Sequence, residues 1–168
     1  MLISAPRMLL EDAAQLTAGW VEVAGERIVA TGAGDPPRAA DAAVEGTLVP
    51  GYVDVHAHGG GGASFVTENP QDVLTATAAH RRLGTTAMVA SLVTGTMDDL
   101  HRQVACLAGL VETGDLMGIH LEGPWLAEKF KSAHPPRLLT DPHPADVAAL
   151  LETGRGAVRM ATIAPERA

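Results

Sequence analysis

At residues 48–62 the chain reads LVPGYVDVHAHGGGG, and its hydrophobic pattern changes within this stretch. Pro50 and Gly51 interrupt an extended segment, and from there short apolar runs alternate with amphipathic segments of helix length. We expect strands at residues 52–55, 85–93, 116–121 and 158–163, and helices at residues 69–84, 96–114 and 144–152. Strand and helix alternate along the chain, which predicts an α/β fold with a parallel sheet and right-handed crossovers.

The residues before this stretch have a different pattern. Residues 1 to about 47 resemble short strands, with a hairpin around residues 20–29, a proline-containing polar stretch at 32–41 and an extended pattern at 44–49. The sequence therefore predicts a small β domain over residues 1–48 and a βα-repeating domain over residues 49–168. A (β/α)₈ barrel takes about 250 residues, so only four of its strands fit here. The second domain is either an open four-stranded sheet or the first half of a barrel.

Composition excludes several classes of protein. The 168 residues are 46% apolar and 19% charged, which is typical of a globular chain. A net charge of −8 argues against a nucleic-acid partner and against a membrane surface. The single cysteine, Cys106, suits a reducing compartment, and neither a signal peptide nor a membrane-spanning run is recognisable. We therefore expect a cytoplasmic protein.

Two histidines follow the first strand of the repeat. His56 and His58 are two residues apart in an extended segment, so both imidazoles point to the same side. Neutral imidazoles at the carboxyl end of a parallel strand suit a borderline divalent metal such as zinc, and the glycines at 59–62 let the chain approach a ligand closely. Asp54 is interpreted as a structural partner beneath the histidines.

A second group of polar residues lies at the end of another strand. His120 and Glu122 share one face there, and a carboxylate could complete a mixed site with the histidine pair. His80 and His101 lie beside arginines on predicted helices, so we interpret both as solvated, and His143 as part of a turn into a helix.

Several motifs resemble one family. LVPGYVDVHAHG at residues 48–59 is similar to the first barrel strand of the amidohydrolase superfamily, which shares HxH widely. HLEGPW at 120–125 and SAH at 132–134 resemble the N-acetylglucosamine-6-phosphate deacetylase family more specifically. LGTT at 83–86 and APE at 164–166 extend the resemblance over essentially the whole chain.

The resemblance implies a fold and an activity. The fold would be the first half of a (β/α)₈ amidohydrolase barrel preceded by part of a small β-sandwich domain. The activity would be metal-dependent hydrolysis of N-acetylglucosamine 6-phosphate to glucosamine 6-phosphate and acetate, in amino-sugar catabolism. The partner would be this small amino-sugar phosphate, and the full-length protein would form a homodimer.

The resemblance also assigns residues. Glu122 matches a metal ligand, His56 and His58 match a pair that binds a second metal in some members, and Ala133 and His134 match a pair that contacts the sugar. The metal would be zinc or iron, with one or two ions. The family's catalytic aspartate and two further metal-binding histidines lie beyond residue 168, so we expect a truncated chain that folds poorly and is inactive alone. The alternatives are another amidohydrolase, such as a cyclic amidase or a different amino-sugar deacetylase, and a non-catalytic fragment.

Overall fold

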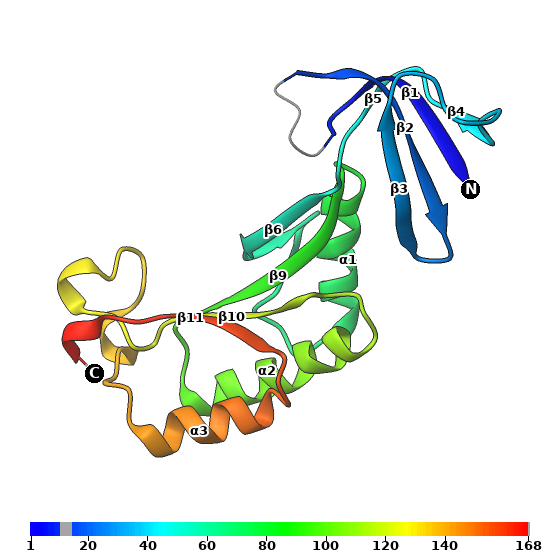
Figure 1. Cartoon of the computed structure of the whole chain (residues 1–168). Coiled ribbons are helices and arrows are strands. Elements are labelled where there is room, and N and C mark those ends of the chain that lie inside the picture. Colours follow the sequence, from blue (N-terminus) through cyan, green and yellow to red (C-terminus); the bar gives the residue numbers. More distant parts are fainter. Residues whose placement is uncertain (11–14, 168) are drawn as a thin grey trace. The chain divides into compact units, whose positions relative to one another are not determined.

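The chain forms two compact units, Met1–Pro50 and Gly51–Ala168 (Figure 1). The structure is a computed structural model and describes residues 1–10 and 15–167. No helix among these residues is both long enough and apolar enough to cross a membrane.

The first unit is a sheet built from β1 (Leu2–Met8), β2 (Thr17–Ala24), β3 (Arg27–Ala33), β4 (Ala42–Ala43) and β5 (Thr47–Leu48). The strand order is β3-β2-β1-β4, and β5 also pairs with β1. The hairpin predicted from the sequence is the antiparallel β2–β3 pair. Of the extended segment expected at residues 44–49, only β5 forms a strand. β1 pairs with β4 and with β5 in two separate ladders, and the exposed residues Glu45 and Gly46 lie between these ladders.

The second unit contains a parallel sheet and its crossover helices. Its elements are β6 (Tyr52–Ala57), β7 (Gly59–Gly60), β8 (Ala63–Ser64), α1 (Pro70–Arg81), β9 (Thr85–Val93), α2 (Met97–Glu112), β10 (Gly118–Glu122), α3 (Pro144–Thr153) and β11 (Val158–Thr162). The sheet has the order β11-β10-β9-β6, and every neighbouring pair is parallel. The expected α/β class with a parallel sheet is confirmed.

Helix boundaries follow from local capping. The side chain of Asn69 accepts a hydrogen bond from the Gln71 N–H at the start of α1, and Thr96 accepts one from the Asp99 N–H at the start of α2. Both helices begin within one residue of the positions expected from the sequence. Single 3₁₀ turns at Glu128–Phe130, Pro136–Leu138 and Pro165–Arg167 interrupt the loops and were not expected.

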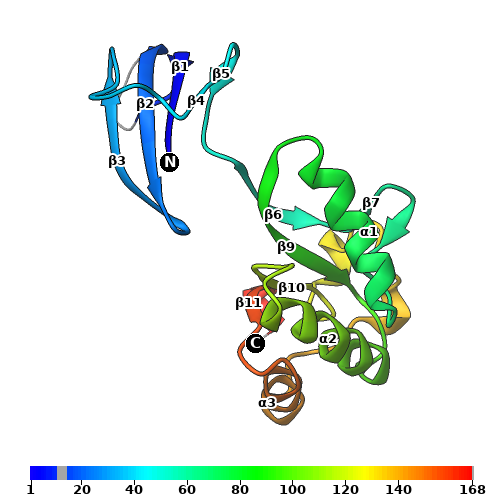
Figure 2. The ribbon, with the colours of Figure 1, turned by 90° about the vertical axis from the view of Figure 1, so that its right-hand side faces the viewer.

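The core lies between the sheet and its helices (Figure 2). Ala90 and Leu92 of β9, together with Ile119 and Leu121 of β10, pack against residues of α1, α2 and α3. Because side chains alternate along a strand, the residues between them point to the opposite face of the sheet. That opposite face carries the polar side chains described next.

The two outer strands are much more exposed than the inner ones. On β6, Tyr52, Val53 and Val55 are 62%, 59% and 50% exposed, whereas Leu92 and Ile119 on the inner strands are fully buried. Among the residues that the structure describes, β6 and β11 have a neighbouring strand on one side only, so their open edges could pair with additional strands.

Candidate metal centre

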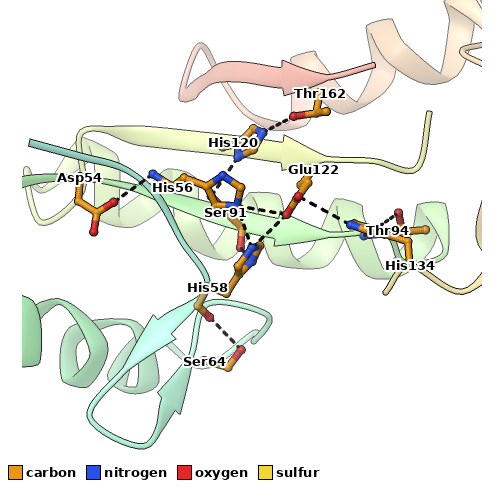
Figure 3. A network of polar contacts seen from close by, with 10 residues as sticks. All are labelled: Asp54, His56, His58, Ser64, Ser91, Thr94, His120, Glu122, His134 and Thr162. Atoms are coloured by element: carbon orange, nitrogen blue, oxygen red, sulfur yellow. Dashed lines mark hydrogen bonds and ion pairs between the residues drawn. The ribbon is translucent and has the colours of Figure 1, made fainter. Parts of the chain in front are cut away.

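Three side chains converge at the carboxyl ends of β6 and β10 (Figure 3). Nε2 of His58 lies 3.0 Å from Nε2 of His56 and 3.0 Å from Oε2 of Glu122, while Nε2 of His56 lies 3.3 Å from the same oxygen. The two histidines and Glu122 are the residues that the sequence brought forward as metal ligands. They form a group that could hold a metal ion.

The backbone explains the convergence. His56 lies near the end of β6 and His58 directly follows it, so both imidazoles point to the same side. Glu122 is the last residue of β10, on the face opposite Ile119 and Leu121, and β9 separates the two strands. The His56 N–H donates to Oδ1 of Asp54 at 3.1 Å, which holds the start of the HxH segment.

The geometry fits a divalent cation. In a tetrahedral site with ligand bonds of about 2.0–2.1 Å, neighbouring ligand atoms lie roughly 3.3 Å apart. The three separations of 3.0, 3.0 and 3.3 Å are close to that value. Nδ1 of His58 lies 3.1 Å from the carbonyl oxygen of Ser91, which can only accept, so the proton of the neutral ring is on Nδ1 and Nε2 carries a free lone pair. Two imidazoles and one carboxylate suit zinc or iron.

His134 borders this group. Its Nε2 is 3.8 Å from Oε1 of Glu122, the carboxylate oxygen that does not face the histidine pair. Its Nδ1 is 2.7 Å from Oγ1 of Thr94, and the ring is 9% exposed. The neighbouring Ala133 lies on the same loop and is exposed. Of the two residues expected to contact a sugar, His134 therefore lies beside the candidate ligands and Ala133 lies at the surface.

His120 has a different environment from the one its strand-end position suggested. The side chain is 1% exposed, with Oγ of Ser91 3.0 Å from Nδ1 and Oγ1 of Thr162 2.8 Å from Nε2. Burial lowers the pKa of His120, and the nearby His56 lowers it further. Both ring nitrogens are occupied by hydroxyl groups, so His120 links β9, β10 and β11 instead of joining the three candidate ligands.

Two helix histidines also differ from expectation. His80 on α1 and His101 on α2 were interpreted as solvated, but both are partly buried. Nε2 of His80 lies 2.9 Å from the carbonyl oxygen of Gly59, and Nδ1 of His101 lies 2.7 Å from Oγ1 of Thr153. His80 thus contacts β7, which follows the HxH segment, and no local pattern reveals this contact between residues 21 positions apart.

Sequence reasoning also missed Ser91 and Thr94, which belong to or follow β9. A signal was present for Ser91, because a polar residue inside the apolar run TTAMVASLV needs a hydrogen-bond partner once the strand is buried. Thr94 gave no such signal, since it stood at the expected end of the strand.

Comparison with known proteins shows which enzymes this chain resembles. The Mycobacterium smegmatis N-acetyl-D-glucosamine-6-phosphate deacetylase, solved as a mutant in complex with N-acetyl-D-glucosamine-6-phosphate, is 48% identical, with a TM-score of 0.93 over 99% of this chain and 44% of that one. The chain is homologous to N-acetylglucosamine-6-phosphate deacetylases. The resemblance expected from the HLEGPW and SAH motifs is thereby confirmed. The sequence matches no protein-family model.

Curated deacetylases agree with this result. The N-acetylgalactosamine-6-phosphate deacetylase of Escherichia coli O157:H7 is 31% identical over 125 residues, which is 71% of this chain and 33% of that enzyme. The N-acetylglucosamine-6-phosphate deacetylase of Danio rerio is 35% identical over 128 residues, again 71% of this chain, and 31% of its own length. The chain thus spans about a third of these curated deacetylases. Their names specify two sugars that differ in configuration at one carbon.

Proposed function

We propose that this chain belongs to a metal-dependent enzyme that hydrolyses the N-acetyl group of N-acetylglucosamine 6-phosphate, giving glucosamine 6-phosphate and acetate in amino-sugar catabolism. The cluster of His56, His58 and Glu122 carries this proposal, because it gives a chain with deacetylase homologues the ligands for a hydrolytic metal. The activity is proposed for a protein that has these residues together with the remaining length of its relatives.

In this proposal the three side chains hold one zinc or iron ion. When bound, such an ion polarises a carbonyl oxygen and lowers the pKa of water. Glu122 supplies Oε2 between the two imidazoles, and the Ser91 carbonyl fixes the tautomer of His58. Asp54 holds the backbone of His56. The resemblance implies further metal ligands, which a second ion would need, and a catalytic aspartate. These residues would lie outside residues 1–168.

His134 and Ala133 are proposed to contact the sugar. His134 supports this role because its ring faces the carboxylate of Glu122 from the side opposite the histidine pair. A sugar bound there would bring its acetyl group next to the candidate metal ligands. N-acetylgalactosamine 6-phosphate is the second candidate substrate, since the similar E. coli enzyme carries that name.

The resemblance supports four further proposals. The second unit would be the first half of a (β/α)₈ barrel, and its parallel strand order β6, β9, β10, β11 agrees with this. The residues before it, 1–48, would be part of a small β-sandwich domain. The complete protein would be a homodimer and would be located in the cytoplasm.

A metal titration tests the centre directly. Wild-type chain, stripped of metal and titrated with Zn²⁺ by calorimetry, is expected to bind one ion, and Glu122→Gln is expected to weaken binding at least about tenfold. The exposed His143 provides a matched control, because His143→Gln removes an imidazole outside the cluster. Equal affinities in wild type and Glu122→Gln would contradict the proposed ligands.

A substrate comparison tests the reaction. Release of acetate from N-acetylglucosamine 6-phosphate is expected to be faster than release from N-acetylgalactosamine 6-phosphate, and cyclic amides should not react. The reverse preference would favour the second substrate, and hydrolysis of cyclic amides alone would indicate another amidohydrolase. Metal binding without any turnover by the full-length protein would indicate a non-catalytic role.

A further inference from the structure

The end of β9 contacts two histidines on opposite sides of Glu122. The carbonyl oxygen of Ser91 faces Nδ1 of His58, and three residues later the backbone N–H of Thr94 faces Nδ1 of His134. A carbonyl group only accepts hydrogen bonds and an amide N–H only donates them. Ser91 in β9 and Thr94 directly after β9 therefore impose opposite requirements on two imidazoles whose Nε2 atoms face the same carboxylate.

The hydrogen bonds of His134 determine where its proton lies. The Thr94 N–H donates to Nδ1 over 3.4 Å, so Nδ1 must be the acceptor in a neutral ring. Oγ1 of Thr94 lies 2.7 Å from the same nitrogen, so the hydroxyl donates as well. The proton of His134 is then on Nε2, the atom that faces Oε1 of Glu122 at 3.8 Å. That separation is too long for a hydrogen bond and leaves the Nε2–H available to another acceptor.

Packing keeps this arrangement in place. Thr94 is 5% exposed and His134 is 9% exposed, so both side chains are largely shielded from solvent. A Cβ on Gly123 would lie 2.1 Å from Oγ1 of Thr94, within the space that the hydroxyl now fills. Gly123 of the HLEGPW motif therefore makes room for the hydroxyl that orients His134.

We propose that Thr94 is a positioning residue that holds His134 as an Nε2–H donor. A histidine binds a metal only through an unprotonated nitrogen, and the unprotonated nitrogen of His134 is occupied by Thr94. His134 is thereby kept out of the metal ligands although it borders Glu122. It presents an N–H to an acceptor oxygen of the ligand, either a carbonyl or a hydroxyl group. The tautomer follows from the hydrogen bonds alone, whereas the identity of the ligand rests on the proposed function.

Nitrogen NMR of the full chain with ¹⁵N-labelled histidine tests the tautomer, with His134→Gln and His58→Gln assigning the signals. We expect His134 to show a protonated Nε2 and an unprotonated, hydrogen-bonded Nδ1, and His58 to show the reverse pattern. Added Zn²⁺ should shift the signals of His56 and His58 and leave the Nε2 proton of His134 in place. A proton on Nδ1 of His134, or loss of its Nε2 proton to Zn²⁺, would overturn the proposal.

Variants of Thr94 separate positioning from simple structural support. Thr94→Val removes the hydroxyl and leaves only the longer contact from the backbone N–H, so the Nδ1 signal of His134 is expected to move part of the way toward that of an imine nitrogen without a donor, whereas Thr94→Ser should keep the wild-type signal. Thr85→Val is the matched control, because Thr85 is a buried threonine at the other end of the same strand. An Nδ1 signal that is the same in Thr94→Val and wild type would refute the role of the hydroxyl, and Thr94→Ala, which also lacks the hydroxyl, gives the same test if the valine variant does not fold.

Kinetics extend the test to the reaction. In the active protein Thr94→Val should raise KM for N-acetylglucosamine 6-phosphate up to about tenfold, the loss expected for one hydrogen bond, with a smaller effect on kcat. Thr94→Ser should recover most of that loss. If the tautomers are as expected but no ion or sugar binds, the proposed function fails and the inference holds. If ion and sugar bind while Nδ1 of His134 carries the proton, the inference fails and the function holds.

Discussion

Replacing Gly123 with alanine should destabilise the second unit through two separate effects. Gly123 has φ of +88°, and a left-handed conformation costs a residue with a Cβ about 1–2 kcal/mol. The new methyl group would also lie 2.1 Å from Oγ1 of the buried Thr94, and forcing extra volume into a packed site costs typically about 1–3 kcal/mol. The two effects together predict a loss of about 2–5 kcal/mol in the free energy of unfolding.

Gly114 provides the control for the backbone effect. Its φ is +80°, and a Cβ built there meets nothing within 4 Å. Gly114→Ala should therefore cost only the conformational part, about 1–2 kcal/mol. The difference between the two alanine variants measures the collision with Thr94.

Urea unfolding followed by tryptophan fluorescence is the assay. Trp125 is 3% exposed and lies in the second unit, and a Trp20→Phe background removes the other tryptophan of the chain. Gly123→Ala should lower the midpoint clearly more than Gly114→Ala, with an unchanged slope. Equal losses in the two variants would refute the reasoning, because Thr94 would then move aside freely and could not hold His134.

Three further outcomes are expected. Leu107→Ala truncates a fully buried side chain and should lower the free energy of unfolding by about 2–5 kcal/mol. Leu83→Ala, at a position that is 81% exposed, should change the free energy of unfolding by less than about 0.5 kcal/mol. Similar losses for the two variants in urea titrations would contradict the placement of Leu107 in the core. Burial raises the pKa of the Cys106 thiol, so a disulfide reagent at pH 8 should modify the folded chain more slowly than the urea-unfolded chain, and equal rates would contradict this environment. The hydrogen bond that Asp41 accepts from the Leu2 N–H lowers the pKa of the Asp41 carboxyl group. The ionised Asp41 therefore stabilises the fold fully above the pKa of the unfolded state, and this stabilisation is lost as the pH falls through the lower pKa of the folded state. The urea midpoint of the first unit should accordingly fall less on acidification in Asp41→Asn than in wild type.

Much of the secondary structure could be predicted because its causes are local. The apolar run at residues 85–93 became β9 with the expected bounds, and the helices expected at 69–84, 96–114 and 144–152 are α1, α2 and α3 with ends within three residues. Caps such as Asn69 and Thr96 act on residues two or three positions away, so they are visible in sequence. The short hairpin β7–β8 was not predicted, since its glycine-rich strands, in which Gly59 pairs with Ser64, show no hydrophobic alternation.

The sequence predicted which residues would gather at the candidate site, but it did not predict which hydrogen bonds their side chains would make. Strand periodicity aligned His56 with His58, and the carboxyl ends of parallel strands brought Glu122 beside them. The same reasoning placed His120 on the face of Glu122, but it could not anticipate that hydroxyl groups on two neighbouring strands would occupy both nitrogens of the ring. Hydrogen-bond competition of this kind depends on which side chains stand next to each other across the sheet.

The sequence by itself determined the order of strands and helices along the chain and brought forward His56, His58 and Glu122 as candidate metal ligands. Periodicity and capping act over a few residues, and parallel strands place their carboxyl ends together whatever lies between them. Only the tertiary structure decided which ring nitrogen of His58 and of His134 carries the proton. The Ser91 carbonyl is 33 residues from His58, and the Thr94 N–H is 40 residues from His134. The hydrogen-bond partner of a ring nitrogen fixes the tautomer of the histidine, so the tautomer is fixed only in the folded chain.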